Sequence, residues 1–310
     1  MSSQRKKVVI GLGPVSTEIV QPVLGDEIAF IEEPTPEDFA QAVGAIVRAA
    51  FVVDKKVMDS MPLLKVIART GVGYDLVDIA EANSRSIPIV ITPGSNTNAV
   101  AEGVMAHALA LSKRLGPLTS LVAVGKFDER TKYPVGDLEG ATLGIIGYGR
   151  IGKRVAHLAD AFGMKVIAYD PFAHIPDSHR VEKLEELYAQ SDFITLHVPL
   201  TPDTSALIDS DAIAQMKPGA ILINCSRGAL IDLDAALPAL RSGQLGGLGL
   251  DVFDPEPPQP HPIFAEANVV LTPHVMGLSK QATTATFIDA ARGVRDVLDG
   301  KEPRAQVQTN

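Results

Sequence analysis

The sequence predicts an α/β fold with two doubly wound parallel-sheet domains. Short apolar runs alternate with helix-like stretches along the whole chain, a pattern typical of parallel strands that are covered by helices on both faces. The 310 residues are 46% hydrophobic and 21% charged, which is enough chain for two cores. Because a second strand–helix series begins at Leu143, we expect a domain boundary near residue 100.

The elements follow one another along the chain. Strands are expected at residues 8–10, 45–47, 64–67, 89–91, 142–146, 165–168 and 193–196. The stretch 98–115 is rich in Ala, Leu, Val and Met and contains no proline. It predicts a long helix that leaves one domain and enters the other. The spacing of apolar residues predicts a last helix at 282–298.

Composition limits the classes of partner. The formal net charge is −9, so no general field draws the chain onto nucleic acid or an anionic membrane. No run approaches the roughly 20 apolar residues that a membrane helix needs. Cys225 is the only cysteine and leaves no internal disulfide. We therefore expect a cytoplasmic protein with a small-molecule partner, and neither nucleic acid nor membrane as a partner.

A glycine-rich turn follows the expected strand at 142–146. Gly147, Gly149 and Gly152 have the spacing Gly-x-Gly-x-x-Gly and precede a helical stretch. Such glycines allow a tight turn, close approach of the backbone to a pyrophosphate, and packing of helix on strand. The next strand ends at Asp170, about 20 residues on, where a carboxylate meets the adenosine ribose. A carboxylate there repels the additional phosphate of NADP, so NAD is the expected cofactor.

A weaker copy of this pattern lies near the N-terminus. Gly11 and Gly13 follow an apolar run, and Glu32 lies at a similar offset. However, Ser16 replaces the third glycine, and Pro14 removes an N–H group. We interpret this segment as a strand–loop turn of the first domain rather than as a second dinucleotide site.

Three expected strands in the C-terminal half lead into side chains with useful chemistry. Arg227 ends one strand, Glu256 lies in a proline-stiffened loop after the next, and His274 follows a third. An arginine grips a carboxylate, a histidine protonates an alkoxide, and a neighbouring carboxylate favours the imidazolium form. Reduction of a 2-oxo acid requires these three functions.

Each of these residues also has a plain structural explanation. Arg227 is equally typical of a surface arginine, Glu256 of a loop acid and His274 of a structural histidine. Cys225 is a candidate thiol nucleophile, but no separate base is implied for it. The other histidines show no regular ligand spacing, so no metal site is expected.

Several separate motifs together resemble the D-isomer-specific 2-hydroxyacid dehydrogenase family, which includes phosphoglycerate, glycerate, hydroxypyruvate and formate dehydrogenases. They are RTGVGYD at 69–75, NAVAE at 98–102, GYGRIG at 147–152, SDFITLHVPLTPDT at 191–204, NCSRG at 224–228, DVFDPEP at 251–257 and PH at 273–274. The resemblance implies a Rossmann NAD-binding domain at 100–284. It also implies a smaller flavodoxin-like substrate domain made of residues 1–99 and 285–310.

The resemblance also implies roles for single residues. Arg227 binds and polarises the substrate, His274 donates the proton, and Glu256 supports His274. Val72 and Gly73 of the other domain receive the substrate carboxylate. Asp251 is implied as the partner of the nicotinamide carboxamide within a larger set of cofactor contacts. That set is Gly147, Gly149, Arg150, Ile151, Gly152, Asp170, His197, Thr204, Cys225, Ser226, Asp251 and Gly277.

The implied activity is NAD-dependent hydride transfer between nicotinamide and C2 of a small 2-hydroxy or 2-oxo acid, in a homodimer joined through the NAD-binding domain. The enzyme would be similar to a glyoxylate or hydroxypyruvate reductase, or to a phosphoglycerate dehydrogenase. The alternative is an NAD-sensing, corepressor-like binding protein. Two residues depart from the family pattern: Phe127 stands where a tryptophan is common, and Met276 stands where a small residue is expected and could narrow the pocket.

Overall fold

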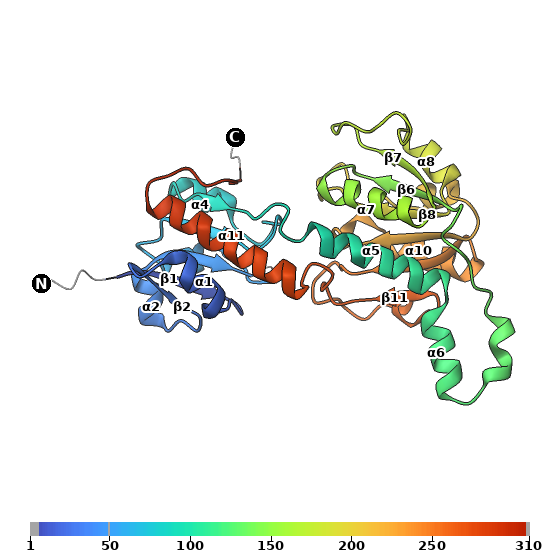
Figure 1. The fold of residues 1–310 in the computed structure, drawn as a ribbon, viewed down its shortest axis with the longest axis horizontal. Coiled ribbons are helices and arrows are strands. Elements are labelled where there is room, and N and C mark those ends of the chain that lie inside the picture. The colour runs from blue at the N-terminus through green and yellow to red at the C-terminus, as the bar shows by residue number, and fades with distance from the viewer. Residues whose placement is uncertain (1–5, 49, 308–310) are drawn as a thin grey trace, which may run out of the picture. The chain divides into compact units, whose positions relative to one another are not determined.

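The computed structural model describes residues 6–48 and 50–307, and its elements are labelled in Figure 1. The chain divides into two compact units. Unit 1 contains Met1–Asn96 and Leu278–Asn310, and unit 2 is Thr97–Gly277. The last helix is continuous from residue 280, with Ser279 Oγ accepting a hydrogen bond from Ala282 N at 3.1 Å. The division therefore falls a few residues before the 284/285 boundary expected from the sequence.

Unit 1 is built on a five-stranded parallel sheet in the order β2-β1-β3-β4-β5. This is the flavodoxin-like order that the resemblance implies. Its strands are β1 (Lys7–Leu12), β2 (Ile28–Ile31), β3 (Ala42–Val47), β4 (Val66–Arg69) and β5 (Ile89–Val90). Its helices are α1 (Thr17–Leu24), α2 (Pro36–Gln41), α3 (Lys55–Asp59), α4 (Ile79–Ser84) and α11 (Lys280–Leu298).

Helix α11 brings the C-terminal part of the chain onto the sheet of unit 1. It packs against α1, β3, β4 and β5. Its buried face contains small residues, and a Cβ placed on Gly293 would overlap the side chain of Val90. Small side chains on this face let the helix lie directly on the strands, so the end of the chain completes the first unit.

Unit 2 is built on a six-stranded parallel sheet in the order β11-β10-β9-β8-β6-β7. A single bridge between Ala168 and Arg180 adds a further short extended segment beside β7, which gives the Rossmann order. Its strands are β6 (Thr142–Ile146), β7 (Lys165–Tyr169), β8 (Phe193–Leu196), β9 (Ala220–Asn224), β10 (Leu245–Leu250) and β11 (Val269–Leu271). Its helices are α5 (Thr97–Ser112), α6 (Leu115–Ala123), α7 (Arg150–Ala161), α8 (Leu184–Gln190), α9 (Ser210–Gln215) and α10 (Leu233–Ser242), with short 3-10 turns η1 (Phe127–Lys132), η2 (Gly228–Leu230) and η3 (Pro262–Ala265).

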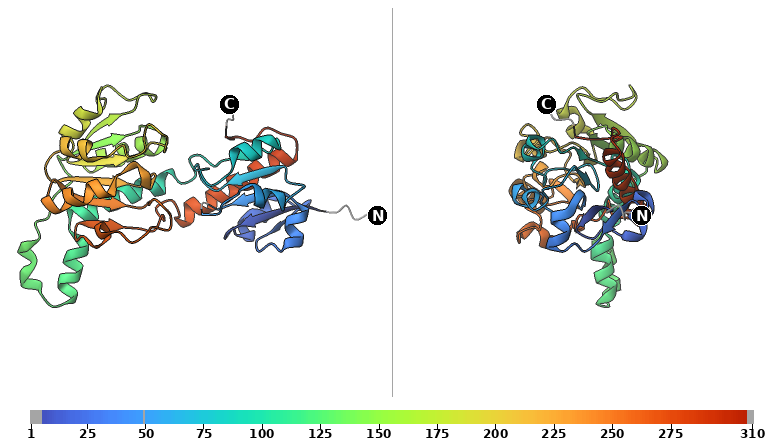
Figure 2. Two further views of the ribbon diagram at one scale, coloured as in Figure 1. Left: turned by 180° about the vertical axis from the view of Figure 1, so that it is seen from behind. Right: turned by 90° about the vertical axis from the view of Figure 1, so that its left-hand side faces the viewer.

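Both faces of this sheet are covered, as Figure 2 shows from two further directions. One buried cluster joins the strands to α8, α9 and α10, and another joins them to α5 and α7. The predicted fold class is therefore confirmed. The expected helix at 98–115 ends earlier, at Ser112, because Arg114 adopts a left-handed conformation with φ 52°. Within residues 6–48 and 50–307, no helix is both long and apolar enough to span a bilayer.

Candidate active site

The candidate residues of unit 2 lie at one edge of its sheet. All six strands run parallel, so their carboxyl ends share that edge, with about 4.8 Å between neighbouring strands. Open α/β sheets bind their ligands at this edge. Across it, each strand is followed directly by residues singled out from the sequence: His274 after β11, Asp251 and Glu256 after β10, Arg227 after β9, His197 after β8, Gly147 after β6 and Asp170 after β7.

The glycine turn after β6 leaves room for a phosphate group. Gly147 has φ 94°, and a Cβ there would lie 2.5 Å from the carbonyl oxygen of His197. A Cβ on Gly152 would overlap the carbonyl of Gly147, so only glycine lets α7 start this close to the turn. A Cβ on Gly149 would meet nothing within 4 Å. The open space beside Gly149, at the N-terminus of a 12-residue helix, fits a pyrophosphate.

Asp170 closes the adenosine side of this turn. Its Oδ2 accepts a hydrogen bond from Tyr148 N at 2.7 Å, and its Oδ1 accepts from Phe172 N and Ala173 N at 2.8 and 2.9 Å. Partial burial acts to raise its pKa, but these bonds and the nearby Lys153 outweigh it and hold the pKa of Asp170 below its ordinary value. The carboxylate is therefore ionised at neutral pH, as a group that accepts ribose hydroxyls must be.

Replacing Asp170 by asparagine is expected to shift the choice of cofactor. The change removes a negative charge where NADP carries its additional phosphate, and about 1.4 kcal/mol of lost repulsion corresponds to a tenfold change. We expect the ratio of kcat/KM with NADPH to that with NADH to rise at least about tenfold. Initial rates with both cofactors measure this ratio. A wild-type enzyme that already prefers NADPH would contradict the assignment of Asp170.

His197 at the end of β8 is a neutral residue behind the turn. Its Nε2 lies 3.1 Å from Thr195 Oγ1, and its Nδ1 is buried without a hydrogen-bond partner among the described residues. Burial lowers the pKa of His197 to about 3. The ring therefore stays uncharged through the physiological range and cannot serve as a proton donor there.

The buried histidines should make stability depend on pH. Burial lowers the pKa of both His107 and His197, so below the ordinary value of 6.5 the unfolded chain binds protons that the folded chain does not. We expect the free energy of unfolding to fall by about 1 kcal/mol per pH unit for each such histidine as pH drops below 6.5. Urea titrations from pH 7 to pH 5 measure the slope, and His197→Asn should reduce it. An equal slope in wild type and variant would contradict this prediction.

The loop after β9 fixes the backbone of Arg227. Asn224 is fully buried; its Nδ2 donates to Arg227 O at 2.7 Å and its Oδ1 accepts from Ser226 N at 3.0 Å. Ser226 Oγ donates to Leu196 O at 2.7 Å and ties the loop to β8. Arg227 Nη1 donates to Ser226 O at 2.7 Å, and Arg227 is half-buried. The arginine thus rises from a hydrogen-bonded loop at the binding edge.

Cys225 in the same loop is a poor nucleophile. Burial, and to a lesser extent the charge of Asp251, raises the pKa of its thiol. The thiol therefore stays protonated at neutral pH, and its sulfur packs against the cluster beneath α5 and α7. This environment supports the structural interpretation of Cys225 over nucleophilic catalysis.

Glu256 and His274 form a pair. His274 Nδ1 lies 2.8 Å from Glu256 Oε2, while Glu256 Oε1 accepts from Phe253 N at 3.0 Å. Because an ionised carboxylate only accepts hydrogen bonds, Nδ1 carries the proton. Nε2 makes no hydrogen bond within the described part of the chain and faces outward from a ring whose side chain is 43% exposed. The pair can therefore present Nε2 to a ligand.

The loops of Arg227 and Glu256 touch directly. A Cβ on Gly228 would overlap the backbone of Phe253 and Asp254. Only glycine allows the chain after Arg227 to lie against the chain before Glu256. This contact places the guanidinium-bearing loop beside the loop that holds the imidazole.

Asp251 holds the loop that carries His274. It is 2% exposed; its Oδ1 accepts from Thr272 Oγ1 at 2.7 Å and from Val275 N at 2.9 Å, and its Oδ2 accepts from Met276 N at 3.1 Å. A carboxylate has about four acceptor positions, so one remains for a ligand. The contact with a nicotinamide carboxamide stays a prediction beside this structural role.

In unit 1, the loop at 70–75 is stabilised from below. Arg69 is 3% exposed; its Nε donates to Gly73 O at 3.1 Å and its Nη1 to Arg48 O at 2.5 Å. Gly71, with φ 121°, exchanges hydrogen bonds with Thr92. Val72 is 41% exposed, and the N–H groups of Val72 and Gly73 have no partner among the described residues. They are thus available to an anion such as a carboxylate.

The glycine pair near the N-terminus has another use for its acidic residue. Glu32 Oε2 accepts from both the N–H and the hydroxyl of Thr17 at 2.9 Å, and so caps the start of α1. Glu32 and Glu33 also line a cavity of about 450 Å³ beside Gly11 and Gly13. An acidic lining disfavours phosphate, which supports the interpretation of this segment as a strand–loop turn.

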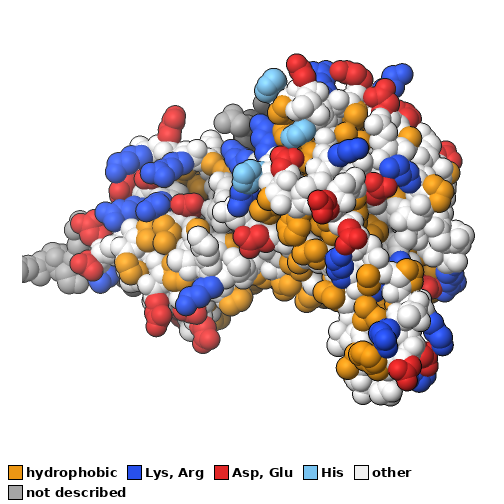
Figure 3. All heavy atoms as spheres, turned by 45° about the vertical axis from the view of Figure 1, so that its right-hand side comes forward, with side chains coloured by type: hydrophobic (Ala, Val, Ile, Leu, Met, Phe, Trp, Pro, Cys, Tyr) orange, Lys and Arg blue, Asp and Glu red, His pale blue; other side chains and the backbone are white. Residues whose placement is uncertain are grey.

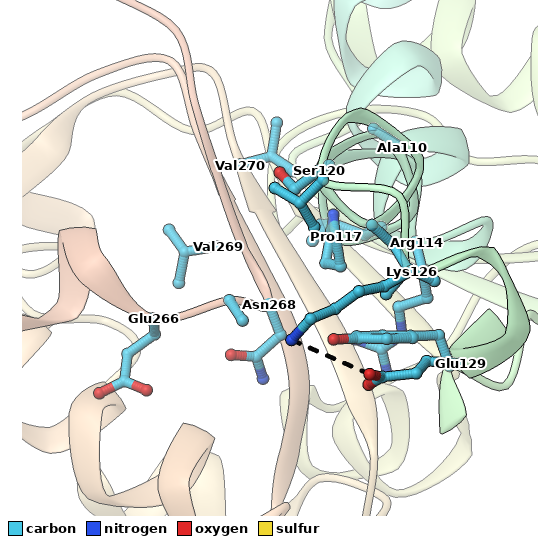
Figure 4. A pocket seen from close by; sticks show the side chains of 16 residues that line it. Ala110, Arg114, Pro117, Ser120, Lys126, Glu129, Glu266, Asn268, Val269 and Val270 are labelled. Carbon is cyan, nitrogen blue, oxygen red and sulfur yellow. Dashed lines mark ion pairs between the residues drawn. The ribbon is translucent and has the colours of Figure 1, made fainter. Parts of the chain in front are cut away.

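A further cavity lies away from the catalytic edge. It has a volume of about 520 Å³ and lies between α6, η1 and the segment 266–270 (Figure 4). Arg114 on its wall donates to Gly246 O at 3.2 Å, near the amino end of β10, and Lys126 lies 3.9 Å from Glu129. None of the candidate catalytic or cofactor residues lines it, so this cavity belongs to the opposite edge of the sheet.

The structure adds residues that sequence reasoning missed. Asn224, Thr272 and His107 are the partners that hold the loops of Arg227 and His274. Asn224 and Thr272 each adjoin a strand end and a candidate residue, a position that could have drawn attention to them. His107 lies more than 140 residues away in sequence from its partner loop, with a separation of 165 residues from Thr272, and carried no such signal.

Comparison with known proteins follows this geometry closely. Residues 105–276, more than half of the chain, match the model of the "D-isomer specific 2-hydroxyacid dehydrogenase, NAD binding domain". A D-3-phosphoglycerate dehydrogenase of Synechocystis sp. is 38% identical over 266 residues, covering 84% of this chain and 48% of that protein. One of Methanocaldococcus jannaschii is 38% identical over 275 residues, covering 87% of this chain and 52% of that protein. The chain thus spans about half the length of the curated relatives it matches.

Solved structures are similar over nearly the whole chain. The TT0316 protein of Thermus thermophilus is 34% identical with a TM-score of 0.87, covering 97% of this chain and 100% of that one. A D-lactate dehydrogenase of Aquifex aeolicus complexed with NAD and lactic acid is 29% identical with a TM-score of 0.81, covering 94% and 96%. Both units of the fold therefore have counterparts in these structures.

Proposed function

Because the chain belongs to the D-isomer-specific 2-hydroxyacid dehydrogenase family, we propose that it is an NAD-dependent enzyme that transfers a hydride between nicotinamide and C2 of a small 2-hydroxy or 2-oxo acid. The observation that carries this proposal is the Glu256–His274 pair, with its 2.8 Å hydrogen bond at the binding edge. Beside it, the loop of Arg227 lies against the loop of Glu256. The three groups that the reaction needs are thus supported by adjoining strand ends.

In this mechanism each side chain has one task. Bound nicotinamide supplies the hydride. Arg227 grips the substrate carboxylate and polarises the carbonyl as charge builds on its oxygen. His274 gives the proton on Nε2 to that oxygen, while Glu256 holds Nδ1 and stabilises the imidazolium form. In the oxidative direction, His274 Nε2 accepts the proton from the hydroxyl.

The cofactor residues divide between the two ends of the edge. Asp170 holds the adenosine ribose, and the turn from Gly147 to Gly152, with Arg150 and Ile151, holds the pyrophosphate. The nicotinamide end is assigned to residues after β8 to β11: His197, Thr204, Cys225, Ser226, Asp251 and Gly277. Val72 and Gly73 of unit 1 are assigned to the substrate carboxylate, which makes unit 1 the substrate-binding unit.

A substrate panel tests the proposal. Micromolar enzyme is mixed with NADH and, in turn, glyoxylate, hydroxypyruvate, pyruvate and 3-phosphohydroxypyruvate, and NADH consumption is followed. We expect at least one acid to be reduced to the D-hydroxy acid. A blank panel with tight NADH binding would instead favour the NAD-sensing, corepressor-like alternative. The relatives named as D-3-phosphoglycerate dehydrogenases place 3-phosphohydroxypyruvate first among the acids to try.

We also propose a homodimer joined through the NAD-binding unit. The residues 115–138 form an arm that extends from this unit in Figures 1 and 2. The arm exposes hydrophobic side chains, some of which are visible in Figure 3. They are Leu115, Val122, Val124, Phe127 and Val135, each more than half exposed. Apolar residues gathered on one segment indicate a surface that is covered in solution, and we place the assembly in the cytoplasm.

Light scattering after size-exclusion chromatography tests the dimer. We expect the wild type at twice the mass of one chain, and the Val124→Asp, Phe127→Asp double variant at the mass of one chain. Both residues are exposed, so these charges should leave the fold of the unit intact. A monomeric wild type, or a variant that remains dimeric, would contradict the role of the arm.

A further inference from the structure

Two residues of α5 contact the two ends of the loop that carries His274. Gly103 and His107 lie four positions apart and are both buried, so they share one face of the helix. A Cβ placed on Gly103 would lie 2.6 Å from Met276 Cβ, Cγ and Sδ. Met276 therefore packs on α5, where a glycine makes room for it. This pairing explains how a large side chain is accommodated at position 276.

His107 holds the other end of the loop through a directed chain of hydrogen bonds. Its Nε2 lies 3.1 Å from Thr272 Oγ1, which lies 2.7 Å from Asp251 Oδ1. The threonine hydroxyl has one proton and the carboxylate only accepts, so Thr272 donates to Asp251. His107 Nε2 must then be the donor to Thr272. This assignment leaves Nδ1 unprotonated, in agreement with its burial without a partner among the described residues.

The helix excludes other states of His107. A Cβ on Gly249 of β10 would lie 2.5 Å from His107 Nδ1, so the ring is closely packed against the strand. A second proton on Nδ1 would be a buried donor with no acceptor, and burial lowers the pKa of His107. The ring is therefore a fixed, neutral donor rather than a titrating group.

The loop needs such support because its backbone is strained. His274 has φ 53°, a left-handed conformation that costs a non-glycine residue roughly 1–2 kcal/mol. Its N–H donates to Thr272 O at 3.0 Å, and the next two N–H groups, of Val275 and Met276, donate to Asp251. The strain persists only if the surroundings fix the loop. Asp251 provides these contacts, and His107 acts on Asp251 through Thr272.

We propose that His107 and Gly103 of α5 are positioning residues that fix the backbone of His274 and so aim its imidazole. This inference rests on the proposed role of His274 as proton donor. His107 touches neither substrate nor cofactor and acts through Thr272 and Asp251. Gly103 acts by receiving the side chain of Met276.

The first test removes the donor and then restores it. In His107→Leu, Thr272 loses the bond that it accepts, and the loop gains access to unstrained conformations in which the imidazole is misplaced. We expect kcat to fall about tenfold, corresponding to a loss of about 1.4 kcal/mol of transition-state stabilisation. The Kd for NADH, measured by fluorescence, should stay unchanged. His107→Gln supplies an N–H donor at a similar reach and should recover most of kcat.

The second test uses the packing pair and is independent of hydrogen bonding. In Gly103→Ala the added methyl group displaces Met276, and we expect kcat to fall while the Kd for NADH is unchanged. Alanine favours a helix over glycine by about 1 kcal/mol, so the helix itself is not weakened. Adding Met276→Ala to this variant removes the overlap and should recover kcat. If His107→Leu does not fold, this pair of variants decides the proposal.

The outcomes separate the inference from the proposed function. Recovery of kcat by His107→Gln and by the Gly103→Ala, Met276→Ala double variant supports the positioning role. Wild-type kcat in both His107→Leu and Gly103→Ala, beside an inactive His274→Ala, overturns the positioning role alone. Wild-type kcat in His274→Ala overturns the proposed function and the positioning role with it.

Discussion

Replacing His274 by alanine is expected to lower kcat for 2-oxo acid reduction on the order of 10³-fold. The alkoxide that forms when hydride reaches C2 then has no positioned proton donor. The Kd for NADH should be unchanged, because the dinucleotide depends on the glycine turn and Asp170. Steady-state kinetics with the best acid of the panel, together with NADH titration, measure both quantities.

Two further variants make this result specific. His274→Asn tests the imidazole with little change of backbone, because asparagine adopts the left-handed conformation of φ 53° more readily than alanine. It should be as inactive as His274→Ala. His261→Ala breaks a similar pair, His261 Nε2 to Asp234 Oδ1 at 3.2 Å, away from the reacting groups and should keep its activity. Turnover near that of the wild type in His274→Asn would remove His274 from the reaction.

Replacing Arg227 by alanine is expected to raise the KM for the acid and to lower kcat by about 10²–10³-fold. Both constants change because the guanidinium holds the carboxylate in the ground state and the carbonyl oxygen more strongly in the transition state. Arg227→Lys keeps the charge but loses the planar fork, so it should lie between alanine and the wild type. Initial-rate measurements over a range of acid concentrations separate the two constants.

A matched arginine serves as the control for this prediction. Arg241 Nε forms a 2.8 Å ion pair with Glu266, but it lies at the end of α10, just before β10 begins at Leu245. It therefore belongs to the amino edge of the sheet. Arg241→Ala should leave kcat and KM unchanged, and equal losses in the two arginine variants would point to general destabilisation instead of a role for Arg227.

The parts of the fold and site that sequence reasoning predicted are those with local signals. Each predicted strand is a continuous apolar run, and all lie in the two observed sheets. Strand β2 (Ile28–Ile31) was missed because its four residues are too short to stand out. The spacing of Gly147, Gly149 and Gly152 predicted a turn whose close contacts the structure confirms. Strand ends likewise predicted the edge at which Arg227 and His274 lie.

What could not be predicted depends on contacts between distant segments. The pairing of Glu256 with His274 crosses 18 residues, and that of His107 with Thr272 crosses 165. Local periodicity carries no information about such pairs. Met276 illustrates the same point: it looked like an intrusion into the pocket until Gly103, on another element, was found beneath it.

The most direct test is a crystal structure of the protein with NADH and oxamate, an unreactive analogue of a 2-oxo acid. We predict that the Arg227 guanidinium and His274 Nε2 both lie within hydrogen-bonding distance of oxamate oxygens, with Glu256 still bonded to Nδ1 and C4 of the nicotinamide facing the carbon that stands for C2. Oxamate bound elsewhere, or seated beside C4 with either Arg227 or His274 out of reach, would contradict the proposed mechanism.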